Sequence, residues 1–98
     1  MPGIITPSEV KERLSKGEKL TLIDVREAEE VQEGMIPGAK HIPLGELPYR
    51  YQEIDTTGEI IMVCRSGARS GRACEYLEHL GLKGLKNMTG GMLEWETL

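Results

Sequence analysis

The chain has 98 residues, 39% of them hydrophobic and 29% charged, which are the proportions of an ordinary globular domain. This length fits a single domain over residues 1–98, and no apolar run approaches the roughly 20 residues of a membrane-spanning helix. The first residues, Met1-Pro2-Gly3, lack the basic flank and apolar core of a signal peptide, so we expect a cytoplasmic protein. The net charge of −4 argues against nucleic acid and anionic membranes as main partners.

Apolar periodicity and turn residues divide the chain into strands that alternate with helices. The predicted strands cover residues 20–25, 40–42, 59–63 and 84–88, and a short apolar run lies at residues 4–5. The predicted helices cover residues 7–16, 28–33, 44–54 and 70–80, with a last helical turn after residue 91. This alternation implies βαβ units and an α/β fold with a parallel sheet, in which ligands gather beyond the carboxyl ends of the strands.

For two of these helices the sequence predicts specific contacts. At the start of the first helix, Thr6 is the expected cap, Pro7 fits the first turn and Glu9 completes a capping box. On the solvated surface of the same helix, ion pairs are expected at i,i+4 spacing, namely Glu9–Arg13 and Glu12–Lys16. In the helix at 70–80, one face is expected to be buried, and its residues are Ala73, Cys74, Leu77 and Leu80.

The segment from Ile60 to Arg72 is the most informative stretch of the chain. An apolar strand ends on Cys64, and a short loop containing arginine, serine and glycine leads into a helix. No acidic residue lies between Glu59 and Glu75, so this segment is a basic island in an acidic protein. Loop amides and the helix N-terminus would stabilise a thiolate or a small anion at Cys64. The alternative is that this cysteine only packs in the core.

The neighbours of Cys64 are consistent with anion binding. Gly67 would close the loop with a positive φ, and Arg65 and Arg69 could clamp the oxygens of an anion or lie as solvated surface arginines. Cys74 fits a structural role better than that of a resolving cysteine or disulfide partner. The spacing of the cysteines and histidines matches no zinc site, so we expect no metal and no cofactor. From the sequence, neither His41 nor His79 can be argued to be a base for Cys64.

Four segments together resemble the single-domain rhodaneses and occur in that family's order over nearly the whole chain. They are Asp24-Val25-Arg26-Glu27, Ile36-Pro37-Gly38-Ala39-Lys40-His41-Ile42-Pro43, Cys64-Arg65-Ser66-Gly67-Ala68-Arg69-Ser70, and Gly90-Gly91 followed by Trp95. The resemblance implies a three-layer fold in which a central parallel sheet of about five strands is flanked by helices on both faces. It also implies sulfurtransferase activity through a cysteine persulfide.

The resemblance also assigns roles to individual residues. Cys64 would be the nucleophile that accepts sulfur, and the residues expected to cradle the outer sulfur are Arg65, Ser66, Gly67, Ala68 and Arg69. Asp24 and Arg26 would form a salt-bridged scaffold that braces the site. The two glycines at 90 and 91 would let the final loop approach the cysteine loop, and Trp95 would anchor the core. Met35 stands where many relatives have a histidine.

The implied reaction moves sulfur from thiosulfate, a small anionic donor, to Cys64 and then to cyanide in an assay or to a thiol or protein acceptor in the cell. The chain is expected to act as a monomer. Two alternatives remain open at this stage. One is a non-catalytic or protein-fed sulfur-carrier module, and the other is a phosphatase or arsenate reductase with a cysteine loop. In dual-specificity phosphatases five residues separate cysteine from arginine, whereas four separate Cys64 from Arg69.

Overall fold

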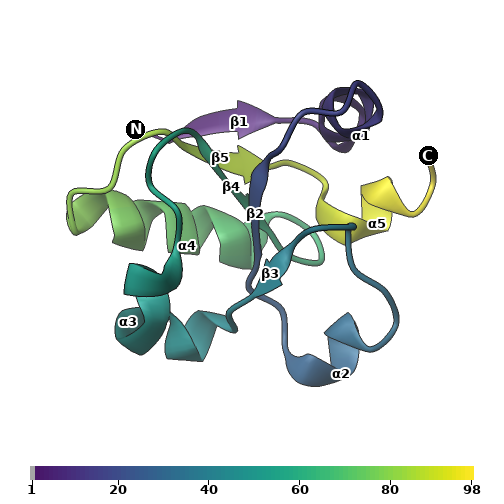
Figure 1. The fold of residues 1–98 in the computed structure, drawn as a ribbon. Helices are drawn as coiled ribbons and strands as arrows, with labels where there is room; N and C mark the ends of the chain where they lie inside the picture. The colour runs from purple at the N-terminus through teal and green to yellow at the C-terminus, as the bar shows by residue number, and fades with distance from the viewer. Residues whose placement is uncertain (1) are drawn as a thin grey trace.

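Five short strands form one parallel sheet in the computed structural model, which describes residues 2–98. The strands are β1 (Gly3–Ile5), β2 (Thr21–Asp24), β3 (Lys40–His41), β4 (Ile60–Val63) and β5 (Leu85–Met88). They lie side by side in the order β1-β5-β4-β2-β3, and every neighbouring pair is parallel (Figure 1). The predicted α/β fold with a parallel sheet of about five strands is confirmed.

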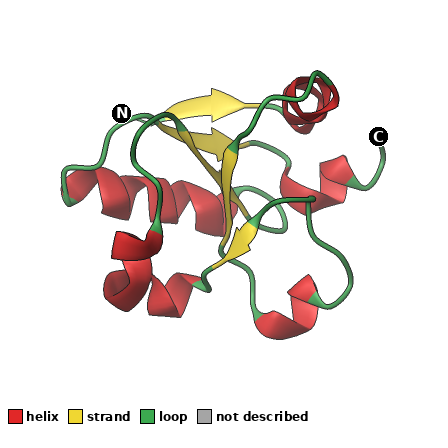
Figure 2. Cartoon of the chain, viewed as in Figure 1, coloured by secondary structure: helices red, strands yellow, loops and turns green. Residues whose placement is uncertain are grey.

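Helices cover both faces of the sheet, as Figures 1 and 2 show. One face carries α1 (Pro7–Ser15) and α5 (Gly91–Trp95), and the other carries α3 (Leu47–Arg50) and α4 (Ala68–His79). The short helix α2 (Ala28–Val31) follows β2. The segment predicted as a weak helix at 44–54 is broken into two 3₁₀ turns, Leu44–Glu46 and Tyr51–Glu53, on either side of α3.

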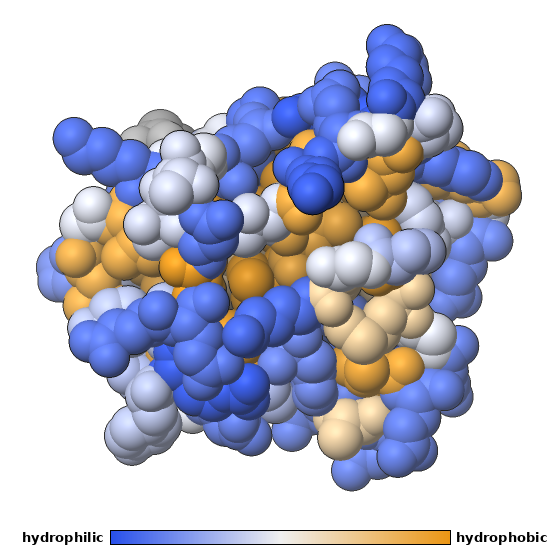
Figure 3. Space-filling model, viewed as in Figure 1, coloured by the Kyte–Doolittle hydropathy of each residue, from blue (hydrophilic) through white to orange (hydrophobic). Residues whose placement is uncertain are grey.

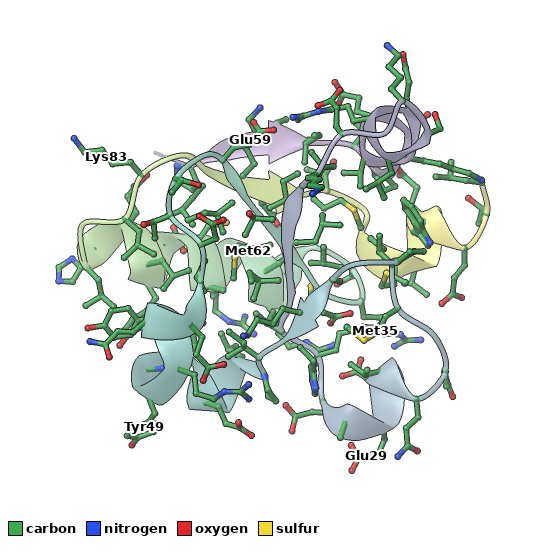
Figure 4. The ribbon with its side chains drawn as sticks, in the orientation of Figure 1. Glu29, Met35, Tyr49, Glu59, Met62 and Lys83 are labelled. Carbon is green, nitrogen blue, oxygen red and sulfur yellow. The ribbon has the colours of Figure 1, made fainter. Side chains whose placement is uncertain are left out.

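The central strand β4 shows why the fold has two cores. All four of its residues are buried, and because side chains alternate along a strand they contribute to opposite faces. Ile60 and Met62 join the core beneath α3 and α4, and Met62 is labelled at the centre of Figure 4. Ile61 and Val63 join the core beneath α1 and α5. A strand buried on both faces is typical of a parallel sheet between helical layers.

The start of α1 agrees with the sequence, whereas its predicted ion pairs agree only in part. The Glu9 amide donates to Thr6 Oγ1 over 3.1 Å and the Thr6 amide donates to Glu9 Oε1 over 2.9 Å, so the capping box is confirmed. Because this cap holds the Glu9 carboxylate, the expected Glu9–Arg13 pair is wrong: Arg13 pairs with Glu18 and Glu59 instead. The other expected pair, Glu12–Lys16, forms with a separation of 3.1 Å.

The limits of α4 differ from the prediction at both ends. The helix begins at Ala68, two residues earlier than expected, which brings Arg69 into its first turn. It ends at His79, and Leu80 is 41% exposed, so the prediction that Leu80 is buried is wrong. Leu80 is the C-cap of α4, and Leu82, two residues further on, packs against the core that Ala73, Cys74 and Leu77 form.

Charged side chains dominate the surface. Hydrophilic residues cover most of the face seen in Figure 3, and apolar atoms show in a band between them. Tyr49 on α3 and Lys83 after α4 point outward in Figure 4, whereas Glu59, near β1, is only partly exposed and pairs with Arg13 and Lys86. Within residues 2–98 no helix combines the length and the apolar character needed to cross a membrane.

Candidate active site

Cys64 lies at the carboxyl edge of the sheet, directly after the last residue of β4. Residues 64–69, named here the cysteine loop, run from the end of β4 into the first turn of α4. The alternation along β4 places Cys64 on the same face as Met62, against α4, and its side chain is fully buried. Gly67 precedes α4 with φ +100°, a left-handed conformation that glycine adopts readily, so the predicted positive φ is confirmed.

Hydrogen-bond donors from the start of α4 surround the Cys64 sulfur. The Gly67 amide donates to Cys64 Sγ over 3.0 Å, and the Ser70 hydroxyl lies 3.3 Å from the same atom. Burial, the largest single influence, raises the pKa of Cys64, but hydrogen bonds from Ser70, Gly67 and Ser66 together outweigh it and bring the pKa below its ordinary value. Cys64 therefore ionises to the nucleophilic thiolate more readily than an ordinary cysteine does.

Cys74 has the opposite environment. It is buried within α4, and burial, ahead of the charges of Glu78 and Glu75, raises its pKa to about 12. Both cysteines are free thiols, so the predicted structural role of Cys74 agrees with its surroundings and no disulfide joins it to Cys64. The protein thus contains one cysteine favoured as a thiolate and one held as a thiol.

Ser70 and Asn87 form a polar pair beneath the cysteine loop. Ser70 is buried, and its hydroxyl oxygen lies 2.5 Å from Asn87 Oδ1, while Asn87 Nδ2 donates to the Gly67 carbonyl oxygen over 3.0 Å. A hydroxyl has one proton, so Ser70 donates either to Asn87 or to Cys64 Sγ at any moment. Asn87 therefore ties the loop backbone to β5 and competes with the sulfur for the Ser70 proton.

The first turn of α5 holds the other side of the cysteine loop. The amides of Met92 and Leu93 donate to the carbonyl oxygens of Cys64 and Arg65, over 2.9 and 3.0 Å. Gly91 is buried with φ +57°, and a Cβ placed there would lie only 2.6 Å from the Cys64 carbonyl oxygen. The predicted close approach of the final loop is confirmed, and it depends on the absence of a side chain at residue 91.

Asp24 and Arg26 form a buried ion pair next to the end of β4. The Val25 amide between them donates to the Val63 carbonyl oxygen over 2.8 Å, which fixes this segment beside the cysteine loop. Arg26 Nη2 donates to Asp24 Oδ2 over 2.8 Å and to the Gly34 carbonyl oxygen over 2.7 Å. The predicted salt bridge is confirmed, and it also anchors the segment after α2.

The two loop arginines have different surroundings. Arg69 forms a two-pronged ion pair with Glu30 of α2, with N···O separations of 2.6 and 2.7 Å. Arg65 is exposed, and within the part of the chain that the structure describes no carboxylate pairs with it. The guanidinium of Arg69 is therefore occupied by a protein carboxylate, whereas that of Arg65 can turn toward a ligand.

A small pocket lies beside the loop. Its volume is about 140 Å³, which suits a small ion better than a nucleotide. Its lining comes from Arg65, from α2 and its flanks, and from α5, and comprises Arg26, Glu30, Glu33, Arg65, Met92, Leu93 and Glu96. No group of three or more His, Cys, Asp or Glu side chains in residues 2–98 is placed to hold a metal ion.

Comparison with known proteins places this geometry in a family. The family model for the rhodanese-like domain matches residues 6–98. The chain belongs to the rhodanese-like domain family. This rhodanese-like domain is 47% identical over 92 residues to YtwF of Bacillus subtilis, a protein named as a candidate sulfurtransferase, with 94% of this chain and 88% of YtwF covered.

Two further comparisons support the assignment. A sulfurtransferase of Allochromatium vinosum is 37% identical over 95 residues, covering 97% of this rhodanese-like domain and 89% of that protein. The crystal structure of a rhodanese-like domain protein from Staphylococcus aureus matches with a TM-score of 0.88 and 36% identity, covering 97% of this chain and 91% of that one. The expected three-layer rhodanese fold is confirmed.

Three polar residues of this rhodanese-like domain were not among the predicted site residues. Ser70 lies one residue beyond the cysteine loop, Asn87 lies in β5, and Glu30 lies in α2. A signal for Asn87 was present, because asparagine is rarely found in the middle of a short buried strand. Glu30 gave no signal, since its contact with Arg69 spans 39 residues. The loop residues Ser66 and Ala68 are exposed, and their role in cradling sulfur stays a prediction.

Replacing the hydroxyl that faces the sulfur is expected to shift the pH dependence of this rhodanese-like domain. Ser70 lowers the pKa of Cys64 by stabilising the thiolate, so Ser70→Ala should raise that pKa. Thiolate formation rises as pH increases through the pKa, and the whole rise should therefore move to higher pH in the variant. Alkylation rates of Cys64 measured across pH check this shift.

The control for that experiment is Ser66→Ala. Its hydroxyl forms no hydrogen bond within the described chain, and only its amide, which alanine keeps, acts on Cys64. The alkylation profile of Ser66→Ala should match that of the unmodified protein. An unchanged profile in Ser70→Ala would contradict the assigned role of the Ser70 hydroxyl.

Proposed function

We propose that this domain is a thiosulfate-type sulfurtransferase that carries sulfur as a persulfide on Cys64. The observation that carries the proposal is the Cys64 sulfur itself, which accepts a hydrogen bond from the Gly67 amide over 3.0 Å at the start of α4. Relatives that are named sulfurtransferases support sulfur transfer as the class of reaction. The proposed reactants are a small anionic sulfur donor and a thiol or protein acceptor.

The first step loads the cysteine. The Cys64 thiolate attacks the outer sulfur of thiosulfate, a new S–S bond forms, and the original S–S bond breaks with its electron pair leaving on sulfite. The outer sulfur remains on Cys64 as a persulfide. Amides of residues 65–69 and the N-terminus of α4 favour the negative charge on that sulfur, and Arg65 offers a cation to the departing anion.

The second step unloads the cysteine. Cyanide or a thiolate attacks the outer sulfur, thiocyanate or a new persulfide is released, and the electron pair of the broken S–S bond returns to Cys64 as the thiolate. The two steps need no proton donor, because sulfite and the Cys64 thiolate both leave as anions. This agrees with the contacts of His41, whose Nε2 donates to the Arg26 carbonyl oxygen over 2.7 Å.

The loop length supports sulfur over phosphate as the ligand. Four residues separate Cys64 from Arg69, and the Arg69 guanidinium is already held by Glu30. A phosphatase needs its loop arginine free to bind the oxygens of a phosphoryl group. In sulfur transfer the loop has to hold only a single sulfur atom, and backbone amides can do this without the Arg69 guanidinium.

Mass spectrometry of the loaded protein tests the proposal. The reduced protein is incubated with thiosulfate, alkylated and digested with trypsin, which separates the two cysteines because Arg65, Arg69 and Arg72 lie between them. We expect one added sulfur atom on the peptide that ends at Arg65, and its removal by cyanide. A sulfur atom on the Cys74 peptide would overturn the assignment. Loading by a persulfide-bearing protein but not by thiosulfate would instead indicate a sulfur carrier.

A further inference from the structure

The ion pair between Glu30 and Arg69 joins α2 to the cysteine loop. Arg69 Nη1 lies 2.6 Å from Glu30 Oε1, and Nη2 lies 2.7 Å from Oε2, so the carboxylate occupies both prongs of the guanidinium. Each of the two side chains is 27% exposed. A two-pronged, partly buried pair of this kind is stronger than an exposed surface pair.

Glu30 is held in place from three sides. The Glu27 amide donates to Glu30 Oε1 over 3.0 Å, and Arg26 Nη1 donates to the Glu30 carbonyl oxygen over 3.2 Å. The hydrogen bonds from Arg69, the largest influence, lower the pKa of Glu30 to about 2, so the carboxylate is charged at any physiological pH. Glu30 is thus a fixed negative charge at the entrance to the loop.

This charge opposes the binding of a free anion. Thiosulfate is a dianion, and to use Arg69 it has to displace a carboxylate that already satisfies both prongs. Two more carboxylates, Glu33 and Glu96, line the pocket beside Arg65. A donor whose sulfur is carried on a thiol lacks the sulfonate oxygens and has no need of Arg69.

We propose that Glu30 is a specificity-determining residue that competes with thiosulfate and other free anionic donors for Arg69, so that such donors are used at a higher KM than they would be without Glu30, which favours a persulfide carried on a thiol over them. This inference rests on sulfur transfer through Cys64. With the favoured donor, the Cys64 thiolate attacks the outer sulfur of R–S–SH, and the S–S bond breaks with its electron pair leaving as R–S⁻. Cys64 retains the outer sulfur and its proton, so atoms and charge balance without an oxidant or reductant.

A binding experiment isolates the effect of Glu30 from the reaction. In the unreactive Cys64→Ser protein, thiosulfate is titrated by NMR with and without Glu30→Gln, which keeps the size and the acceptor for the Glu27 amide. We expect about three- to fivefold tighter thiosulfate binding in Glu30→Gln, the size expected when one partly exposed ion pair no longer competes. The matched control is Glu29→Gln on the same helix, because Glu29 is exposed and points away from the domain (Figure 4).

Kinetics of the reactive protein give the second readout. Glu30→Gln should lower KM for thiosulfate by a similar factor, leave kcat unchanged, and leave kcat/KM for cysteine persulfide unchanged. Weaker or equal thiosulfate binding in Glu30→Gln, or an equal gain in Glu29→Gln, would overturn the inference. If neither donor loads Cys64, the proposed function fails, whereas the binding result in the Cys64→Ser background still decides the role of Glu30.

Discussion

Cys64→Ser is expected to abolish sulfur loading and to lower sulfur-transfer activity by at least about a thousandfold, the scale on which covalent catalysts lose rate without their nucleophile. Serine keeps the shape of the side chain but supplies no thiolate at neutral pH. The donors around Sγ would then face an unreactive hydroxyl. Mass spectrometry after thiosulfate treatment and a cyanide-dependent thiocyanate assay measure the two losses.

Cys74→Ser is the matched control. It makes the same atomic change on a cysteine whose pKa is raised to about 12, which stays a thiol during the assay. This variant should keep the sulfur adduct and the activity, although burying a hydroxyl without a designed partner should lower the free energy of unfolding by about 1–3 kcal/mol. Persistence of the adduct in Cys64→Ser, or its loss in Cys74→Ser, would mean that the wrong sulfur has been assigned.

Gly91→Ala is expected to lower the free energy of unfolding by about 3 kcal/mol or more, which combines left-handed strain with overpacking against fixed backbone. A Cβ at residue 91 would meet the carbonyl groups of Cys64 and Arg65, which accept the first amides of α5. Removing this clash requires movement of either α5 or the cysteine loop, so sulfur loading should fall along with the free energy of unfolding. Urea denaturation and the loading assay measure the two effects.

Gly17→Ala is the control that separates the cost of backbone strain at a positive φ from the cost of a steric clash. Gly17 also has a positive φ, +82°, but a Cβ there would meet nothing within 4 Å. This variant should lose only about 1–2 kcal/mol from the left-handed conformation and keep full sulfur loading. Equal losses in the two variants would show that the contact between α5 and the loop carries no particular constraint.

The parts of the fold that were predictable depend on residues that lie close together in the chain. The apolar run of β4, the Thr6–Glu9 capping box and the Gly67 turn each depend on residues a few positions apart, and all three are present. The position of Cys64 followed from the same kind of signal, because a strand that ends on cysteine before a glycine-containing loop has few alternative structures.

The parts that were missed depend on residues far apart in the chain. Arg69 was expected to be available for an anion, but Glu30 reaches it across 39 residues. Arg13 was expected to pair within its own helix, but the nearest carboxylate was already used in a cap and Glu59 was closer in space. A charged side chain has many partners within reach, and only the tertiary arrangement selects one.

The attachment of α5 to the cysteine loop also sets an order of events during folding. The amides of Met92 and Leu93 complete the backbone hydrogen bonding of Cys64 and Arg65, yet they lie in the last helix of the chain. A ribosome-bound chain that has released residues only as far as α4 therefore lacks the two hydrogen bonds that hold the loop backbone from the side of α5. Docking of α5 therefore completes the backbone hydrogen bonding of the cysteine loop, and fraying of α5 in the finished protein would free the carbonyl groups of Cys64 and Arg65 and loosen the loop.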